Sequence, residues 1–292
     1  MKKSLSLFTI VLVTLLFSCT TQKKEAVFQV PFEKYTLPNG LTVILHEDRS
    51  DPITAVAIAF HVGSAREVEG KTGFAHLFEH MMFQKSENVG EDQLFKLIQG
   101  AGGELNGGTS FDNTVYYEVI PKNALELALW LESDRLGYLE NTVTQTAFAN
   151  QQNVVQNEKR QSVDNAPYGF NDYLILKNLY PKGHPYSWDV IGDMADLQNA
   201  TIEDVKAFHR KFYTTNNATL VIAGDINKDE VKALVEKYFG EIPQGEPVET
   251  RGSMQPDLAS TVNLYHEDNF AKAPRLTLVF PTVEQFTKDS YA

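Results

Sequence analysis

Short runs of β-branched and aromatic residues recur along the chain, and they predict β-strands. Turn-forming residues stand at several of their ends, such as Asn39 and Gly40 before the first run and Gly63 after the second. Apolar runs of this length with glycine or asparagine at their ends are typical of strands. The predicted strands are 41–46, 55–62, 113–120 within the segment 105–121, 218–223 and 273–280.

Helices are predicted where apolar residues instead recur three or four positions apart. The clearest case is 123–139, whose leucines fall near one stripe, and 145–164 contains neither glycine nor proline. Thr201 and Asp204 form the pattern of an N-cap with a short capping box. The predicted helices are 74–83, 91–100, 123–139, 145–164, 170–179, one that begins after Thr201, and 229–239.

The composition is that of an ordinary globular chain. Its 292 residues are 42% hydrophobic and 22% charged, which suffices for one or two domains. The formal net charge is −12, and removal of residues 1–18 would take away two lysines and no acid, giving −14. An acidic surface argues against nucleic acid as a partner and against a polybasic contact with membranes. Residues 242–260 are rich in proline, glycine and acids, so we expect a linker there.

The N-terminus resembles a bacterial lipoprotein signal. Residues 1–3 carry two lysines, and 5–17 form an apolar stretch that is too short and too early for a membrane span. This stretch leads into Leu-Phe-Ser-Cys19, which is similar to a lipobox. We therefore expect 1–18 to be a lipoprotein signal peptide and 19–31 a tether. The alternative is an ordinary signal peptide with an incidental cysteine.

Lipidation of Cys19 would determine where the protein acts. It implies a location in the bacterial cell envelope, periplasmic or surface-facing, with attachment to the membrane by the lipid alone. Cys19 is also the only cysteine, so the chain can form no intrachain disulfide and its fold must rely on the core.

The most informative motif is His76-Leu-Phe-Glu79-His80, within the predicted helix 74–83. The two histidines are four positions apart, so a helix projects both imidazoles from one face, with Glu79 beside them. A catalytic zinc needs such ligands, and a carboxylate as general base for its bound water. The order H-x-x-E-H is the inverted zinc-protease signature. The alternative is two core histidines on a buried helix, with Glu79 paired elsewhere.

A further acidic residue, Glu158, follows on the predicted helix 145–164. A structural zinc is usually closed by four protein ligands, often cysteines, and the one cysteine here is already assigned to lipidation. Three protein ligands with one open position are instead the arrangement of a catalytic zinc. The residue content therefore favours a catalytic site over a structural one.

Other motifs are spread along the chain in a fixed order. They are Tyr35-Thr-Leu-Pro-Asn-Gly-Leu, Gly63-Ser64 with Glu67, the H-x-x-E-H motif, Leu105-Asn106 with Thr109, Asp112, Thr114 and Tyr116, Glu158 within Val-Gln-Asn-Glu-Lys-Arg, His184-Pro-Tyr, and Asn217-Ala-Thr-Leu-Val-Ile-Ala-Gly-Asp225. Together they resemble peptidase family M16, which includes pitrilysin, insulin-degrading enzyme and the mitochondrial processing peptidase. The resemblance extends from about Phe32 to the end of the chain.

This resemblance implies the ligand set of the site. His76, His80 and Glu158 would bind one Zn²⁺ per chain, and Glu79 would be the catalytic base. The chain departs from the family at Gln151, where members often carry a second acidic residue. That departure puts an outer-shell carboxylate in doubt, but not the ligands themselves.

The resemblance also implies a fold. It is α+β, built of modules with a mostly antiparallel sheet flanked by helices, which form half of a clamshell. We expect a zinc-binding catalytic module over 32–195 and the start of a second, incomplete module over 196–292. A second half of the same family would lie in the same full-length chain or in a partner subunit.

The predicted function is that of a zinc-dependent endopeptidase that hydrolyses peptides or unfolded polypeptides, with Glu79 as general base. Its substrate would bind as an added strand on an exposed sheet edge. Leu105, Asn106, Gly107 and Thr109 are the candidate edge, because their glycine-rich segment lets another backbone approach closely. The alternative for this segment is a flexible turn.

The sequence is compatible with two other functions. One is a non-catalytic M16-like binding subunit of a two-chain peptidase, and the other is a zinc hydrolase that acts on something other than peptides. Relatives without activity usually lose the histidines or the glutamate, and this chain keeps all of them. We expect Glu132 and Asp134 on a solvated helix face rather than beside the metal. Tyr116 and Tyr117 should divide between core and surface.

Overall fold

The computed structural model describes residues 29–252, 254–256 and 258–291. The predicted signal peptide, Cys19 and most of the predicted tether lie outside these residues, so their assignments stay predictions. From Phe32 onward the chain forms one unit. Within the described ranges, no helix is long and apolar enough to cross a membrane.

In the described part of the chain, a six-stranded sheet has the strand order β1-β2-β6-β3-β5-β4. The pairing of β2 with β6 is parallel, and the other pairings in this sheet are antiparallel. The predicted α+β class with a mostly antiparallel sheet is therefore confirmed. The strands are β1 (Glu33–Thr36), β2 (Thr42–Glu47), β3 (Ile53–Phe60), β4 (Glu104–Thr109), β5 (Thr114–Pro121) and β6 (Ala218–Gly224).

Strand β6 enters this sheet from beyond residue 195, the predicted end of the first module. It lies between β2 and β3, with Val221 opposite Ile44 and Ile222 opposite Val56. Residues after 195 thus complete the sheet that residues before 195 begin. The division into modules 32–195 and 196–292 stays a prediction.

The predicted helices are present, most of them within two residues of the expected ends. The segment 145–164 forms one helix followed by a π-helical turn, Arg160–Asp164. The capping box of Thr201 and Asp204 is confirmed. Two short elements, β1 and α7, were not predicted. The helices are α2 (Phe74–Met81), α3 (Gln93–Gly100), α4 (Leu125–Tyr138), α5 (Gln145–Lys159), α6 (Asn171–Leu179), α7 (Met194–Asn199), α8 (Ile202–Phe212) and α9 (Lys228–Phe239).

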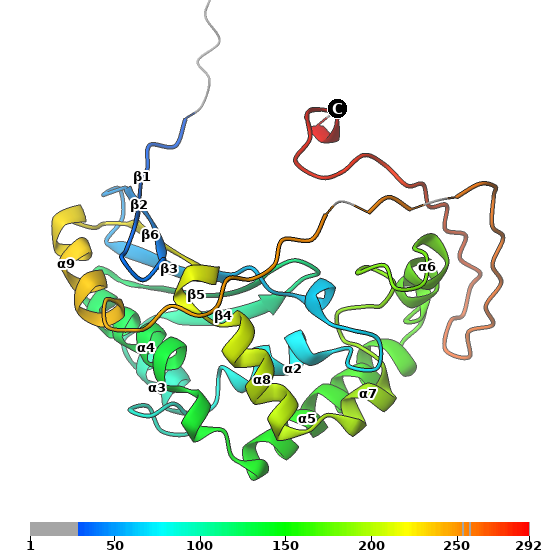
Figure 1. The fold of residues 1–292 in the computed structure, drawn as a ribbon, viewed down its shortest axis with the longest axis horizontal. Helices are drawn as coiled ribbons and strands as arrows, with labels where there is room; N and C mark the ends of the chain where they lie inside the picture. Colours follow the sequence, from blue (N-terminus) through cyan, green and yellow to red (C-terminus); the bar gives the residue numbers. More distant parts are fainter. Residues whose placement is uncertain (1–28, 253, 257, 292) are drawn as a thin grey trace, which may run out of the picture. The chain divides into compact units, whose positions relative to one another are not determined.

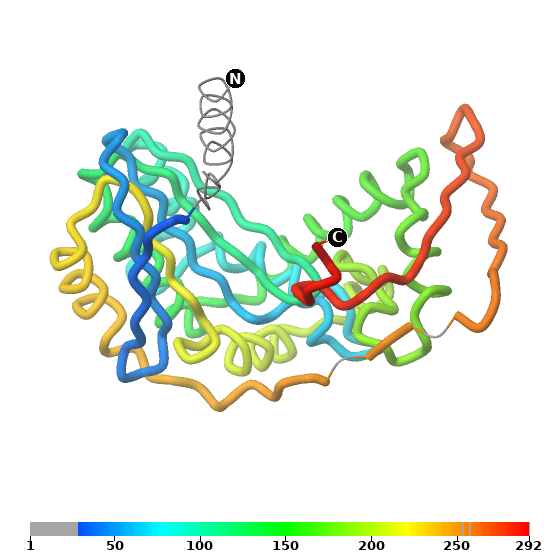
Figure 2. Tube along the Cα trace, turned by 90° about the horizontal axis from the view of Figure 1, so that it is seen from above, coloured from blue at the N-terminus to red at the C-terminus, as the bar shows by residue number. Residues whose placement is uncertain are grey.

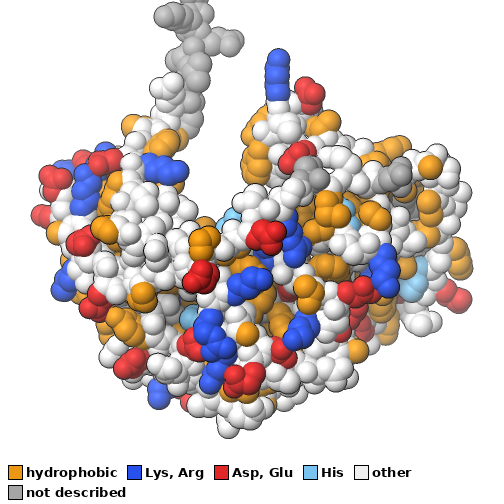
Figure 3. Space-filling model, viewed as in Figure 1, with side chains coloured by type: hydrophobic (Ala, Val, Ile, Leu, Met, Phe, Trp, Pro, Cys, Tyr) orange, Lys and Arg blue, Asp and Glu red, His pale blue; other side chains and the backbone are white. Residues whose placement is uncertain are grey.

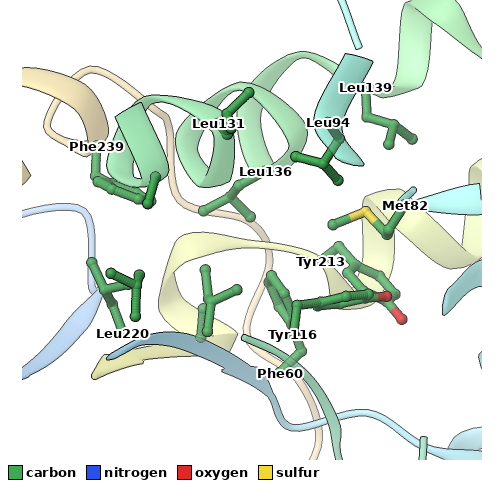
Figure 4. Packing of buried hydrophobic residues seen from close by; sticks show 14 of the residues in the cluster. Phe60, Met82, Leu94, Tyr116, Leu131, Leu136, Leu139, Tyr213, Leu220 and Phe239 are labelled. Atoms are coloured by element: carbon green, nitrogen blue, oxygen red, sulfur yellow. The ribbon is translucent and has the colours of Figure 1, made fainter. Parts of the chain in front are cut away.

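The core lies between the sheet and the helices that cover one of its faces (Figure 1). On β3, Val56, Ile58 and Phe60 are buried, whereas the alternating alanines lie on the less buried face. The ring of Tyr116 is fully buried, with its centroid 6.1 Å from that of Phe60 (Figure 4). Tyr117, the next residue, is 41% exposed. The predicted division of the two tyrosines is confirmed.

The described residues of 242–260 form the irregular linker that the sequence predicts. Hydrogen bonds attach it to the loop before α2: the Arg66 guanidinium donates to the carbonyl of Glu249 over 2.6 Å, and Arg251 donates to the carbonyl of Ala65. After the linker the chain turns back on itself (Figure 2).

The predicted strand 273–280 is wrong. The segment has no regular secondary structure and pairs with no strand in the described residues. Leu276 and Phe280 are 85% and 75% exposed, and hydrophobic side chains lie on the surface in this region (Figure 3). An apolar run becomes a strand only where a neighbouring strand pairs with its N–H and C=O groups. The sequence pattern indicates strand propensity only, and whether the segment forms a strand depends on a neighbouring strand that can pair with it.

Candidate metal centre

Helix α2 carries the H-x-x-E-H motif on its less buried side. The side chains of His76 and His80 are 12% and 24% exposed. The opposite side of the helix packs into the core, which holds the motif at the edge of the hydrophobic layer. The buried residues of α2 are Phe74, Ala75, Leu77, Phe78 and Met81.

The buried carboxylate of Glu67 fixes the start of α2. It accepts hydrogen bonds from the backbone N–H groups of Gly73, at 2.9 Å, and Ala75, at 2.8 Å. Gly73 is left-handed with φ +84°, and a Cβ there would lie 2.6 Å from the carbonyl oxygen of Ile191. Burial raises the pKa of Glu67 well above its ordinary value, and the N–H groups oppose this shift. Because Glu67 sets where the helix begins, it also sets where His76 lies.

We expect Glu67→Gln to lower the free energy of unfolding by about 1–3 kcal/mol. The amide has a single acceptor oxygen, and its NH₂ group would face a backbone donor. Thermal unfolding of the metal-free protein measures this loss.

The matched control is Glu69→Gln. The Glu69 side chain is 68% exposed, and its only ion pair in the described residues is a 3.5 Å contact with Lys182. This variant should therefore change stability by less than about 0.5 kcal/mol. Equal losses in the two variants would contradict the capping role of Glu67.

Three donor atoms from α2 and α5 converge. The Nε2 atoms of His76 and His80 are 3.3 Å apart, and Oε2 of Glu158 lies 3.7 Å and 3.4 Å from them, respectively. Tetrahedral zinc with bonds of about 2.0–2.2 Å places its ligand atoms roughly 3.3–3.5 Å apart. The observed separations come close to this spacing, and two imidazoles with one carboxylate are ligands that zinc accepts. Among the described residues, this is the one such group of three donors.

The charge states around this group suit metal binding. Burial lowers the pKa of His76, and a hydrogen bond from His80 lowers the pKa of Glu158. Neutral imidazole and ionised carboxylate are the forms that ligate a metal. Past Glu158 the helix continues into the π-helical turn, where the Ser162 hydroxyl donates to the Glu158 carbonyl at 2.8 Å. Such turns are frequent at functional sites.

Glu79 lies on α2 between the two histidines but outside this donor group. Its Oε2 accepts a hydrogen bond of 2.6 Å from the hydroxyl of Thr109, on β4. The sequence motif had suggested only a role in substrate binding for Thr109 and did not predict this contact. Thr109 was noticed as part of a motif, but a motif does not show which side chain a residue meets.

The candidate substrate-binding residues all lie on β4, at the edge of the sheet. They are Leu105, Asn106, Gly107 and Thr109. A tight turn joins β4 to β5, with the N–H of Ser110 bonded to the carbonyl of Asn113 at 2.8 Å. Hydrogen-bonded pairs alternate along an antiparallel ladder. Counting from this turn, the N–H and C=O groups of Leu105, Gly107 and Thr109 point away from β5, toward the open edge.

One observation at Gly107 agrees with this orientation, and another explains why the residue is a glycine. Its N–H is bonded to the side-chain oxygen of Asn106 at 2.9 Å rather than to β5. A Cβ at Gly107 would lie 2.9 Å from the ring of Phe83 and 3.0 Å from that of Tyr116, so any larger residue would force these rings to move. Because it has no side chain, Gly107 allows β4 to pack closely against the rings of Phe83 and Tyr116.

The expectation of a solvated face for Glu132 and Asp134 is wrong, since both are buried in α4. Glu132 accepts a 2.9 Å hydrogen bond from Nε of Arg135, and Asp134 accepts one of 2.6 Å from the amide of Asn88 and another from Ser86. Acidic side chains can be buried when hydrogen-bond donors or positive charges lie next to them. Neither residue belongs to the group of converging donors.

Comparison with known families gives two matches. The family described as Insulinase (Peptidase family M16) matches residues 42–180, and the one described as Peptidase M16 inactive domain matches residues 199–292. The three converging donors and Glu79 all fall within the first match.

Similar proteins include enzymes named as proteases. The zinc protease PqqE of Helicobacter pylori is 34% identical over 239 residues, which are 82% of this chain and 52% of that protein. The mitochondrial-processing peptidase subunit beta of Caenorhabditis elegans is 28% identical over 263 residues, covering 84% of this chain and 56% of that protein. The chain spans about half the length of the relatives it matches.

Solved structures share the fold. A protease from Helicobacter pylori matches with a TM-score of 0.74 and 32% identity, over 78% of this chain and 55% of that one. Pitrilysin matches with a TM-score of 0.69 and 23% identity, over 81% of this chain and 25% of that one. The predicted fold, a mostly antiparallel sheet flanked by helices as in one half of such proteases, is confirmed.

Proposed function

The chain belongs to peptidase family M16, and from this premise we propose that it is the zinc-binding half of a metalloendopeptidase. Its substrates are peptides or unfolded polypeptides. The observation that carries the proposal is the spacing of Nε2 of His76, Nε2 of His80 and Oε2 of Glu158, which suits the ligands of one tetrahedral zinc.

Each polar residue of the site has a role in this proposal. Zn²⁺ held by His76, His80 and Glu158 would act as a Lewis acid that lowers the pKa of the attacking water and polarises the scissile carbonyl. Glu79 accepts a proton from the attacking water and passes it to the departing amine nitrogen. The partial exposure of both histidines leaves room for a peptide to reach them.

Substrate joins the open edge of β4 as an added strand. The outward N–H and C=O groups of Leu105, Gly107 and Thr109 provide main-chain hydrogen bonds, and the Asn106 side chain releases the Gly107 N–H when a peptide arrives. This mode suits extended chains, because a folded protein seldom offers a free strand.

A second half of the same family completes the enzyme, either in the same full-length chain or in a partner subunit. The support is length, since the chain spans about half of the relatives it matches. Binding and turnover should therefore be measured on the complete gene product.

The decisive experiment combines zinc analysis with cleavage of an unstructured, fluorescence-quenched peptide. We expect one zinc per chain, with cleavage that is lost on chelation and restored by added zinc. Zinc binding without cleavage, even with the second half present, would instead favour a non-catalytic binding subunit. A protein that binds no zinc would overturn the proposal.

We also propose that the protein is tethered in the bacterial cell envelope through lipid on Cys19. Cys19→Ser should abolish incorporation of labelled palmitate and shift the protein from the membrane fraction to the soluble one, because the lipid attaches to the thiol. Ser18→Ala is the control, since it keeps a small residue beside the cysteine and should be labelled normally. A wild-type protein that takes up no palmitate would identify an ordinary signal peptide, and undiminished labelling of Cys19→Ser would contradict lipidation of Cys19.

A further inference from the structure

We propose that Thr109 is a positioning residue for Glu79, so that the strand that binds substrate also orients the general base. This inference rests on the proposed function and goes beyond it, because there Thr109 contributes only its backbone. The observation that leads to it is the 2.6 Å hydrogen bond from the Thr109 hydroxyl to Oε2 of Glu79.

The hydroxyl protons in this region can be assigned one by one. Thr114 lies opposite Thr109 across β4 and β5, and its hydroxyl donates to the carbonyl of Val62 over 2.9 Å. The hydroxyls of Thr109 and Thr114 are 3.3 Å apart. Because Thr114 already gives its proton to Val62, the single proton of Thr109 is available for Glu79, at the shorter distance and with an ionised acceptor.

Thr114 in turn holds Thr109 in place. It is fully buried, and its bond to a backbone carbonyl ties it to the loop that follows β3. Threonine has a stiff side chain, so this contact and the strand geometry leave the Thr109 hydroxyl little freedom. Glu79, by comparison, has a long side chain on a helix and a partly exposed position. The hydrogen bond therefore constrains the flexible partner, the carboxylate.

The backbone of Thr109 connects this bond to substrate binding. Its N–H and C=O groups face the open edge of β4. A peptide added there would bond to the same residue whose side chain holds the base. One oxygen of Glu79 is then occupied by Thr109, and the other is left for the proton of the attacking water.

The test compares Thr109→Val with Thr109→Ser in the complete gene product. Valine keeps the branched shape and the strand propensity but has no hydroxyl, whereas serine restores the hydroxyl alone. The matched control is Thr54→Val on β3, because the Thr54 hydroxyl is buried without a hydrogen-bond partner in the described residues. The measurements are kcat and KM for the quenched peptide, zinc per chain, and thermal unfolding.

We expect Thr109→Val to lower kcat about 10- to 100-fold, as for loss of a hydrogen bond to a charged group. KM, zinc content and the unfolding temperature should stay near their wild-type values. Thr109→Ser should recover most of the lost kcat, and Thr54→Val should behave like the wild type.

Other results would overturn the inference. A rise in KM with unchanged kcat would make Thr109 a substrate-binding residue only. A Thr109→Ser protein as slow as Thr109→Val would show that shape matters and the hydroxyl does not. Wild-type kinetics in Thr109→Val would exclude any role. A wild-type protein that cleaves no peptide would overturn the proposed function itself, and this inference with it.

Discussion

Replacing Glu79 with glutamine is expected to leave one zinc per chain and to reduce peptide cleavage roughly 10²- to 10⁴-fold. Glutamine has nearly the same shape and its oxygen can still accept the hydrogen bond from Thr109, so the site should stay assembled. The amide cannot take a proton from the attacking water, and the loss should therefore fall on kcat. Zinc analysis and steady-state kinetics on the same preparation measure the two effects separately.

The second carboxylate of the site provides the comparison. Glu158→Gln removes a donor that lies 3.4 Å and 3.7 Å from the two imidazole nitrogens, so this variant should lose zinc as well as cleavage. Added zinc should restore part of its activity, whereas it should restore none to Glu79→Gln. If Glu79→Gln also lost its zinc, Glu79 would be a ligand and the assignment of the base would be wrong.

The donors of the site could be identified from sequence in two different ways. His76 and His80 follow from helical periodicity, because residues four apart on any helix share a face. Glu158 lies far along the chain, and no local pattern links it to them. Only the resemblance to a family predicted it as the third ligand, and the convergence of α2 and α5 agrees with that prediction.

The contacts that support the site could not be identified in this way. Glu67 and Thr109 both belong to recognised motifs, but their roles depend on which groups they meet. Glu67 meets the N–H groups that begin α2, and Thr109 meets the carboxylate of Glu79. Such contacts form between segments that are separate in sequence, so periodicity and capping rules, which describe local sequence, cannot predict them.

The same limit explains the two errors in the fold. The segment 273–280 has the composition of a strand, yet pairing requires a partner that the described residues do not provide. Glu132 lies on a helix with a continuous run of buried residues, and burial of its charge is possible because Arg135 pairs with it there. Neither the missing partner nor the counter-charge can be derived from local sequence.

The buried charges of α4 lead to the second large effect that we expect, which is on stability. Arg135 donates to both carboxylate oxygens of Glu132, one of them over 2.9 Å, and approaches Glu118 on β5 at 3.5 Å. All three residues are at most 3% exposed. The guanidinium also lies over the ring of Tyr116, 4.3 Å from its centroid. Burial, with a further contribution from Glu132, raises the pKa of Glu118 well above its ordinary value.

Arg135→Met should therefore lower the free energy of unfolding by about 3–5 kcal/mol, since it leaves the charge of Glu132 buried without its partner. For a domain of this size, that corresponds to a fall in Tm on the order of 10 °C. Denaturant unfolding at neutral pH measures the free energy directly. Arg135 bonds to both oxygens of Glu132, so Glu132 is the carboxylate that the guanidinium balances.

A double variant separates the loss of a partner from the loss of packing. Glu132→Met with Arg135→Met removes both charges and fills the space with apolar groups of similar length, and replacements of this kind are often neutral or stabilising. It should be more stable than Arg135→Met alone by several kcal/mol, although it differs more from the wild type. If the double variant were as unstable as the single one, the loss would come from packing of the arginine against Tyr116 and not from an unpaired charge.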